Sequence, residues 1–367
     1  MNRISLLSQR RSFLGFGSAL IVGAVALTGC AGSTGAESGG TGSEESDTIG
    51  VSLIVKTTTN PFFIAMQDGA KAAAADQGVE LSLAAGKKDG DEDSQITAIE
   101  NAIAKGDKGI LITPTGPAVE DAMIKARDAG LFVIALDTPP TDPEAADITF
   151  ATDNRLAGEL IGQWTAAQLG GEKATIALLD LFSDKVVSVD YARDQGFLAG
   201  LGVDVKDENK NGDEDPTGSY SGGEYEIVGS QPTDGAEDGG RAAMETLLSK
   251  NSDINVVYTI NEPAAYGAYQ ALQAAGKTDV LIVSVDGGCA GIDNVKGGVI
   301  GATSQQYPVK MAELGIKAIV DLVKNGTEPE VTPGLDFFNT GVALVTDKPA
   351  EGVESIDTTA ALDICWG

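Results

Sequence analysis

The chain has 367 residues, of which 42% are hydrophobic and 22% charged, a composition typical of a globular protein long enough for two domains. It contains no histidine, which excludes His-based catalytic triads, imidazole general bases and His-ligated zinc. The formal net charge of -29 disfavours nucleic-acid phosphates, and the sequence shows no basic module that would reverse this. We therefore predict no nucleic-acid partner.

The first 29 residues have the features of an export signal. Basic residues precede an apolar run over 13–27, which is shorter than the ~20 residues of a membrane span. RRSFL at 10–14 resembles a twin-arginine export motif, and LTGC at 27–30 resembles a bacterial lipobox, which implies lipidation of Cys30. The alternative is a plain cleaved signal with an incidental cysteine.

Residues 30–47 are rich in Gly and Ser and lack large apolar side chains, which predicts a flexible, lipidated tether. We therefore expect a protein that is exported and anchored by a lipid to the outer face of the cell membrane, in the periplasm or at the cell surface.

From residue 49 onward, apolar runs of strand length alternate with helical segments. The predicted strands cover 49–55, 79–85, 109–113, 131–136, 174–180, 225–230, 254–260, 280–286 and 299–304. The predicted helices cover 61–77, 93–105, 117–129, 155–169, 235–250, 262–275 and 308–324. The strands are mostly continuous apolar runs, which is typical of parallel sheets covered by helices on both faces.

These units are too many for one such sheet, so we predict two doubly wound α/β domains. The first domain is expected to comprise 48–153 plus 307–333, and the second 154–306 plus 334–367. Three chain crossings, near 152–155, 305–308 and 332–335, would form the hinge, with the ligand in the cleft between the domains.

Polar residues follow the predicted strands at the edge where open parallel sheets bind ligands. They are Lys56 to Asn60, Asp137-Thr138, Asp153-Asn154, Asn261-Glu262, Asp286-Gly287 and Gln305-Gln306. Each aspartate taken alone could equally be a turn or helix-cap residue. No Gly-rich phosphate loop opens a helix, which argues against nucleotides. Carboxylates and carboxamides together suit a neutral polyhydroxyl ligand, whose hydroxyls both donate and accept hydrogen bonds.

Two phenylalanines, Phe62 and Phe63, directly follow Asn60-Pro61. They could be core residues that begin the helix, or a platform for a ligand. Side chains in a first helical turn lean toward the preceding strand end, where the cleft is expected. We therefore predict that both rings face the ligand, with Phe63 also packed along the helix stripe that contains Met66.

The chain resembles the ribose-type and fructose-type substrate-binding proteins of bacterial ABC importers, in the periplasmic binding protein type I family. The matching motifs are TNPFF (59–63), ILITPT (110–115), ALDT (135–138), ATDN (151–154), RDQGF (193–197), TINEPAAYGA (259–268), IVSVDGG (282–288) and ATSQQYP (302–308). The resemblance implies a protein that is not an enzyme, uses no cofactor, closes two domains on a monosaccharide and delivers it to a membrane permease. It implies a sugar site formed by Lys56, Asn60, Phe62, Phe63, Asp137, Arg193, Asn261, Asp286 and Gln306.

Three positions depart from the ribose-binding pattern. Thr138 stands where ribose binders have arginine, Tyr191 aligns with a cleft arginine, and Gly235 aligns with a stacking aromatic. Arg193 lies two residues beyond Tyr191 and is therefore a candidate contact. SVDGG, GLDFF and CWG are most similar to the fructose-type branch, so we expect fructose, with ribose or xylose as alternatives.

Three other functions are alternatives to transport: an enzyme acting on sugars, a repressor and a sensor component. Asp137 and Asp286 could pair as acid and base, but no motif supports sugar hydrolysis. A repressor of the same fold would need an N-terminal helix-turn-helix in place of the signal and tether. A sensor component that presents the loaded form to a membrane receptor is an alternative to transport, and we expect a monomer.

Two cysteines and one acidic loop complete the candidate features. Export to an oxidising compartment predicts a disulfide between Cys289 and Cys365, with two free thiols as the alternative. Loop 207–218 matches the first part of a calcium loop, but its last ligand position holds Gly218 in place of a bidentate glutamate. A solvated acidic loop is therefore the favoured interpretation, and calcium the alternative. The candidate calcium ligands are Asp207, Asn209, Asn211 and Asp215.

Overall fold

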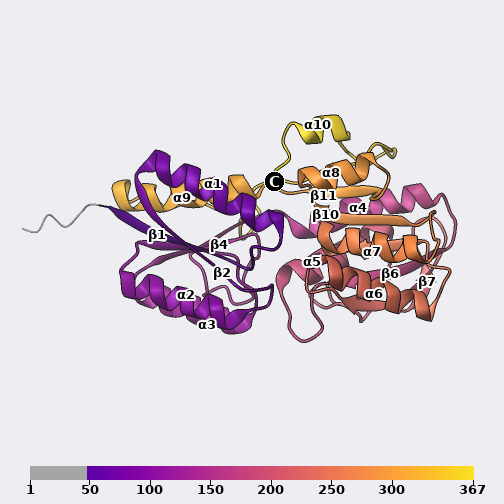
Figure 1. Cartoon of the computed structure of the whole chain (residues 1–367), viewed down its shortest axis with the longest axis horizontal. Coiled ribbons are helices and arrows are strands. Elements are labelled where there is room, and N and C mark those ends of the chain that lie inside the picture. Colours follow the sequence, from indigo (N-terminus) through magenta and orange to yellow (C-terminus); the bar gives the residue numbers. More distant parts are fainter. Residues whose placement is uncertain (1–47) are drawn as a thin grey trace, which may run out of the picture. The chain divides into compact units, whose positions relative to one another are not determined.

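A computed structural model describes residues 48–367, so the predicted signal, Cys30 and the tether lie outside the described residues. The described chain forms two α/β lobes, each built on its own sheet (Figure 1). The strand orders are β12-β5-β4-β3-β1-β2 in the first sheet and β13-β11-β10-β9-β6-β8-β7 in the second. The prediction of two doubly wound, mostly parallel sheets is confirmed.

The first lobe contains the N-terminal part of the described chain and two later segments. All of its strand pairs are parallel, with Ile49 opposite Val79 and Val51 opposite Gly109. Its elements are β1 (Ile49–Val55), α1 (Pro61–Gln77), β2 (Val79–Ala85), α2 (Glu92–Lys105), β3 (Gly109–Ile112), α3 (Pro117–Asp128), β4 (Phe132–Leu136), β5 (Ile148–Ala151), α9 (Pro308–Asn325) and β12 (Phe338–Asn339).

The second lobe has a parallel sheet with antiparallel strands at its two edges, because β13 pairs with β11 and β7 pairs with β8 in that sense. Its elements are α4 (Asn154–Leu169), β6 (Ala174–Asp180), α5 (Ser188–Leu201), β7 (Thr217–Ser219), β8 (Glu224–Pro232), α6 (Glu237–Lys250), β9 (Val256–Thr259), α7 (Glu262–Ala274), β10 (Leu281–Asp286), α8 (Cys289–Lys296), β11 (Ala302–Gln305), β13 (Ala343–Val345) and α10 (Thr358–Leu362).

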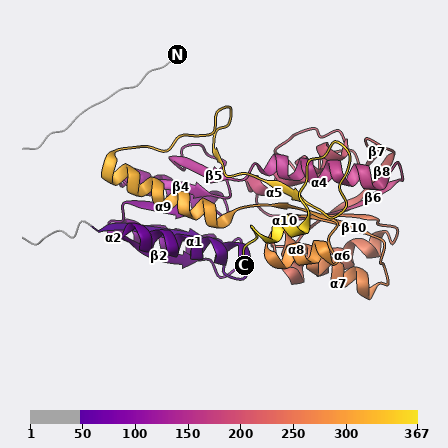
Figure 2. The same ribbon diagram turned by 90° about the horizontal axis from the view of Figure 1, so that it is seen from above.

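Helices cover both faces of each sheet, which explains why the strands read as continuous apolar runs. In the first lobe, α1 and α9 lie side by side on one face and α2 and α3 on the other (Figures 1 and 2). Met66 and Ile316 belong to the core on the first of these faces, and Ile99 and Met123 to the core on the second. In the second lobe, α4 packs with α5 and α6 packs with α7.

Local sequence signals position the first turn of α1 at the sheet edge. The Asn60 side chain accepts a hydrogen bond from the Phe62 N–H, and Pro61 begins the helix without needing a donor partner. Gly78 ends the helix with a φ of 70°, a conformation that glycine adopts without steric cost. The helix therefore begins directly beyond the carboxyl end of β1.

Three segments connect the lobes. They lie between β5 and α4, between β11 and α9, and between β12 and β13. The predicted boundary at residue 334 is too early, because Phe338 and Asn339 still pair with β5 of the first sheet. A strand of two residues is too short to show a hydrophobic pattern in the sequence, so β12 is recognised only from its pairing with β5. The chain crosses after Asn339, where the Thr340 N–H donates to Ala151 O.

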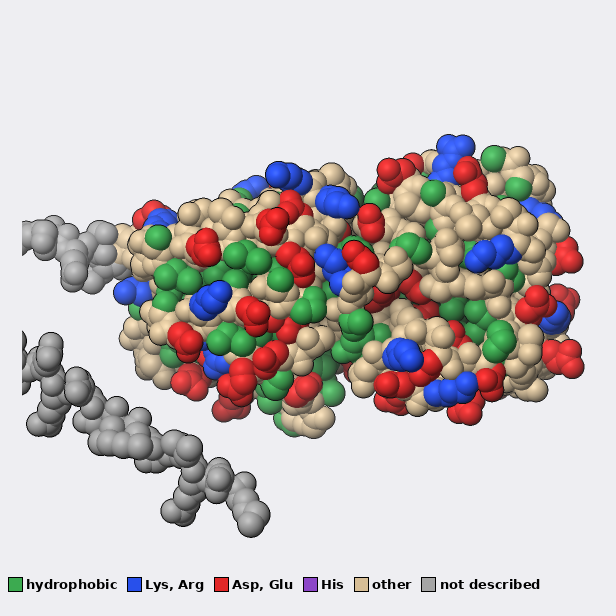
Figure 3. All heavy atoms as spheres, turned by 90° about the horizontal axis from the view of Figure 1, so that it is seen from below, with side chains coloured by type: hydrophobic (Ala, Val, Ile, Leu, Met, Phe, Trp, Pro, Cys, Tyr) green, Lys and Arg blue, Asp and Glu red, His purple; other side chains and the backbone are tan. Residues whose placement is uncertain are grey.

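The described surface carries charges of both signs. On the face shown in Figure 3, acidic side chains are spread over both lobes and basic side chains lie among them. No helix within residues 48–367 is long and apolar enough to span a membrane.

Candidate functional site

The carboxyl ends of strands from both sheets surround one buried cavity. All nine predicted site residues line it, together with Asp89, Leu181, Val189 and Ile260. The nine are Lys56, Asn60, Phe62, Phe63, Asp137, Arg193, Asn261, Asp286 and Gln306. The cavity encloses about 30 Å³, far less than the ~300–1,000 Å³ of typical small-molecule sites. A ring-sized ligand therefore needs the lobes to separate or the lining side chains to move.

Contacts between the lobes close the mouth of this cavity. The Lys185 ammonium donates to Gly90 O at 3.1 Å, and the Ser188 hydroxyl donates to Pro139 O. Lys88 Nζ lies 3.7 Å from Asp234 Oδ2, and both side chains are more than half exposed. These contacts join loops of the first lobe to the second lobe, so the structure corresponds to a closed arrangement.

Asp137 follows β4 and lies between two cations. Its Oδ2 is 3.8 Å from Lys56 Nζ and its Oδ1 is 3.6 Å from an Nη atom of Arg193. The Thr138 hydroxyl also donates to Oδ2 at 2.8 Å. Asp137 has a φ of 64°, an uncommon value for a residue with a side chain but one that aspartate tolerates. One buried carboxylate thus binds a cation from each lobe.

Arg193 reaches the cavity from α5, which the sequence left open. Its Nε donates to Asn154 Oδ1 at 2.7 Å and an Nη donates to Ile260 O at 3.0 Å. These two bonds fix the guanidinium plane, and the remaining donors point toward Asp137. Asn154 was predicted among the polar residues that follow strands, but it was not included in the predicted sugar site.

Asp286 is the last residue of β10 and lies beside a second buried acid. Its carboxylate accepts hydrogen bonds from the Glu262 N–H and from the Gln306 carboxamide, both at 3.2 Å. Burial raises the pKa of Asp286 to about 7, although Arg193 opposes the shift. Burial and the charge of Asp286 raise the pKa of Glu262 to about 8, although Glu262 accepts from Gly287, Gly288 and Thr303.

Asn60 and Asn261 serve both as helix caps and as lining residues. Each Oδ1 accepts from a backbone N–H in the first turn of its helix, at 2.9 Å for Asn60 and 3.0 Å for Asn261. The amide group of Asn261 also donates to Gly235 O at 3.0 Å. The structural and functional interpretations of these residues are thus compatible, because the cap fixes the side chain at the cavity wall.

Phe62 and Phe63 lie between the core of the first lobe and the cavity. The two rings pack edge to face with centroids 5.3 Å apart, and both belong to the core of the first lobe. Both also line the cavity. The first turn of α1 therefore presents apolar ring surface to the cavity while anchoring it in the core.

Asp89 lines the cavity from the loop after β2, and sequence reasoning missed it. It obeys the same strand-end rule as the predicted residues, because β2 ends at Ala85 in the same sheet. The signal was obscured because residues 87–93 include six charged side chains, and the sequence does not indicate which of them turns inward.

The predicted disulfide is present, and the calcium alternative is not supported. Cys289 and Cys365 are bonded, with their Cα atoms 5.0 Å apart. Within the described residues, no group of three or more acidic or cysteine side chains is arranged to hold a metal ion. Asp215 instead pairs with Lys206 at 2.7 Å, and Gly218 lies in β7, where no glutamate closes the loop.

The fold and the site define a class, namely a protein with two lobes that encloses a small polar solute at the strand ends of both sheets. A model of the family described as the periplasmic binding protein domain matches residues 49–328. The chain therefore belongs to the periplasmic binding protein family, whose members bind solutes for transport and carry out no reaction on them, without a cofactor.

Curated relatives and solved structures agree with this assignment. The ribose import binding protein of Salmonella typhimurium is 28% identical over 288 residues, covering 78% of this chain and 88% of its own. The D-allose-binding periplasmic protein of Escherichia coli is 27% identical and covers 80% of this chain and 91% of its own. A solute-binding protein of Agrobacterium vitis with bound D-fucose has a TM-score of 0.70 at 24% identity, over 86% of this chain and all of its own.

Proposed function

We propose that this protein captures a monosaccharide between its two lobes and delivers it to the permease of an ABC importer, with fructose as the first candidate. The observation that carries the proposal is the cavity at which three carboxylates, two cations, carboxamides and two phenylalanine rings converge from the two lobes. The ribose and allose binding named for its relatives supports the sugar class.

The chemistry of the lining suits a sugar. Carboxylates accept strongly from hydroxyl groups, and Lys56 and Arg193 donate to ring or hydroxyl oxygens. The apolar C–H face of a sugar ring can lie against the Phe62 or Phe63 ring. Three carboxylates and two cations line the cavity, and burial raises the pKa of one of these carboxylates, Asp286, to about 7. The lining therefore carries little net charge, which suits an uncharged polyhydroxyl ligand better than an ion.

The preference for fructose rests on the resemblance to the fructose-type branch and on three departures from the ribose-binding pattern. Thr138 and Tyr191 replace arginines, and Gly235 replaces an aromatic residue. Ribose and xylose are the competing ligands, and the comparison of affinities below decides among them.

Binding is coupled to closure in this proposal. Asp137 and Arg193 lie in different lobes, and a sugar that bridges them stabilises the closed form relative to the open one. The closed form would then dock on the permease. Lipidation at Cys30 would keep the exported protein close to that permease.

Calorimetric titration of the purified protein with fructose, ribose, xylose and glucose tests the ligand. We expect fructose to bind most tightly. Binding of another of these sugars in its place would contradict the fructose assignment alone. Absence of binding to every sugar at millimolar concentration would contradict the sugar-binding function.

Alanine variants at the two rings test the platform. We expect Phe62→Ala and Phe63→Ala each to weaken sugar binding and to lower Tm, because both rings line the cavity and belong to the core of the first lobe. Unchanged affinity in both variants would contradict the role of these rings as a platform for the sugar.

Small-angle scattering tests closure, since the radius of gyration should fall on saturation with sugar.

A further inference from the structure

Residues 358–367 extend from the second lobe to the first and lie next to the cavity wall. We call them the C-terminal strap. It begins with α10, which the Asp357 side chain caps and which is tied to Asp347 through Thr358. It ends with Trp366, which belongs to the hydrophobic core of the first lobe. The strap is therefore a further connection between the lobes, in addition to the three crossings of the chain.

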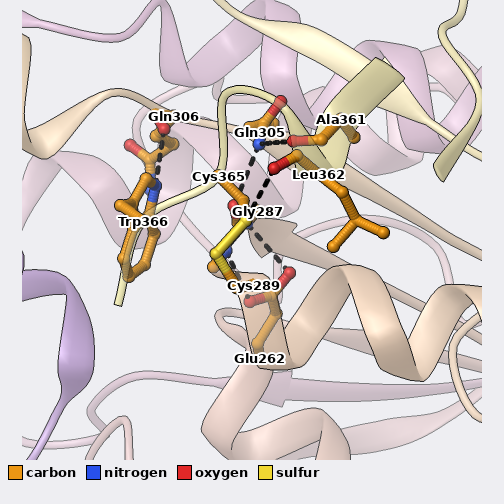
Figure 4. Close-up of a disulfide and its surroundings, with 10 residues drawn as sticks. Glu262, Gly287, Cys289, Gln305, Gln306, Ala361, Leu362, Cys365 and Trp366 are labelled. Carbon is orange, nitrogen blue, oxygen red and sulfur yellow. Dashed lines mark hydrogen bonds between the residues drawn. A yellow bond between two sulfur atoms is a disulfide. The ribbon is translucent and has the colours of Figure 1, made fainter. Parts of the chain in front are cut away.

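Covalent and backbone bonds fix the strap on the second lobe (Figure 4). Cys365 is bonded to Cys289 at the start of α8, and the Cys289 N–H donates to Trp366 O at 2.9 Å. Trp366 also forms an isolated parallel bridge with Gly288. The disulfide thus holds the backbone of Trp366 against the loop that follows β10.

The loop after β10 begins directly beyond Asp286, and the side chain of Glu262 binds its backbone. The Glu262 carboxylate accepts from the N–H groups of Gly287 and Gly288, at 2.9 and 3.1 Å. Gly288 has no side chain, and a Cβ there would lie 3.2 Å from the Trp366 ring. The loop is therefore shaped to accept the indole at this position.

Trp366 contacts two residues of the proposed sugar site, Gln306 and Phe62, outside the cavity. Its indole Nε1 donates to Gln306 O at 2.8 Å, while the side chain of Gln306 donates to Asp286. Its ring packs edge to face on Phe62, with centroids 5.3 Å apart and an interplanar angle of 82°. The Trp366 side chain is 8% exposed, so these contacts are largely shielded from water.

We propose that Trp366, held by the Cys289–Cys365 disulfide, is a positioning residue that fixes the Phe62 ring and Gln306 for the ligand in the closed form. The proposal rests on the sugar-binding function proposed above. Trp366 does not line the cavity, so it acts through these two residues. Because Phe62 belongs to one lobe and the strap is anchored on the other, the ring contact also favours closure.

Affinity measurements on Trp366 variants test the proposal, with the other tryptophan as a matched control. Trp164 is also buried, and its Nε1 also donates to a backbone oxygen, that of Lys348 at 2.8 Å. It lies in the core of the second lobe away from the cavity. We expect Trp366→Ala to weaken sugar binding about tenfold or more and Trp366→Phe to weaken it less. We expect Trp164→Phe to lower Tm without changing the affinity.

The disulfide is tested by the Cys289→Ser/Cys365→Ser double variant. We expect this double variant to bind sugar more weakly than wild type. We also expect Trp366→Ala to reduce affinity by a smaller factor in the double variant than in the wild-type protein. Full additivity of the two changes would contradict the role of the disulfide as the anchor.

A spectroscopic readout separates positioning from general destabilisation. The chain has two tryptophans, so Trp164→Phe leaves Trp366 as the sole indole fluorophore. We expect its fluorescence to change on addition of sugar, because the Phe62 contact tightens on closure. Unchanged emission during saturation, or wild-type affinity in Trp366→Ala, would overturn the inference while the sugar-binding function stands. Absence of sugar binding by the wild-type protein would overturn both.

Discussion

Asp137 and Asp286 occupy equivalent places in the two lobes but have opposite electrostatic surroundings. Asp137 directly follows β4 and Asp286 ends β10, and each has a positive φ, 64° and 155° respectively. Asp137 lies within 4 Å of two cations, whereas Asp286 lies beside the buried carboxyl of Glu262. The two sheets thus place one residue type at one topological position for two different purposes.

The difference identifies what each carboxylate contributes. Asp137 links the lobes, since Lys56 comes from the first lobe and Arg193 from the second. Asp286 is a proton-sensitive acceptor, since burial raises its pKa to about 7. The same fold position therefore holds a carboxylate paired with cations of both lobes in the first lobe, and a carboxylate with a raised pKa in the second, for which we propose a ligand contact.

Removing Asp137 should have the largest effect on stability. Asp137→Ala leaves Lys56 and Arg193 buried without their counter-ion, and loss of one member of a buried pair typically costs ~3–5 kcal/mol. Urea denaturation should show a decrease of that order in the free energy of unfolding. Asp68→Ala, which breaks an exposed pair with Lys71, is the control and should change it by less than ~1 kcal/mol. A similar loss in both variants would contradict the assignment.

Neutralising Asp286 should weaken sugar binding at alkaline pH. Asp286→Asn keeps the shape but removes a charged acceptor, at a cost of ~1.5–3 kcal/mol, or about 10- to 100-fold in affinity. Calorimetric titration at pH 8 measures this.

The wild-type protein should mimic that variant at low pH. Asp286, with a pKa of about 7, gains a proton as the pH falls, so affinity should decrease between pH 8 and pH 5.5. The charge of Arg193 and the hydrogen bond from the Glu262 N–H lower the pKa of Asp286, whereas the charge of Asp137 raises it. The Asp286→Asn variant should show a much flatter profile. An equally steep profile in the variant would show that another group is responsible.

Two further buried acids in the second lobe, Asp180 and Asp194, form no ion pair in the described structure and therefore differ from Asp137. Asp180 and Asp194 are both buried, and burial together with the charge of Asp190 raises the pKa of Asp180 to about 8. The folded state therefore retains a proton that the unfolded state releases above its ordinary pKa of about 4. The stability from this proton should be lost as the pH rises from about 4 to 8, by up to ~1.4 kcal/mol per pH unit.

Asp194→Asn tests this stability profile. The variant removes one of the two competing charges, so its free energy of unfolding should fall less between pH 5 and pH 8 than that of wild type. Denaturant titrations at the two pH values measure the difference. An identical decrease in both proteins would assign the pH dependence to other groups.

The exposed contact across the cleft mouth should have the smallest effect. Lys88 and Asp234 are 72% and 56% exposed, so water and salt screen their attraction. Lys88→Ala should weaken sugar binding at most about fivefold at low salt. The difference should vanish at high salt. Lys71→Ala, which breaks an exposed pair within α1, should leave affinity unchanged at both salt concentrations.

Local signals in the sequence sufficed for most helices and for the strand ends. The Asn60-Pro61 start and Gly78 end predicted α1 at its observed bounds, because caps act through hydrogen bonds within four residues. The boundary at 334 was wrong because β12 depends on pairing with β5, far away in the sequence. Glu262 was predicted only as one of the polar residues that follow strands, and the fold alone reveals that it accepts hydrogen bonds from Gly287 and Gly288 after β10.

The sequence by itself determined the alternation of strands and helices, the family, and which strand ends carry polar side chains. Only the tertiary structure decided that Arg193, fixed by Asn154, meets Asp137, and that Trp366 meets Phe62. The physical reason is the separation along the chain over which each interaction acts. Hydrophobic periodicity and helix caps act between near neighbours in the chain, whereas these contacts join residues of different lobes that come together only after both sheets have formed.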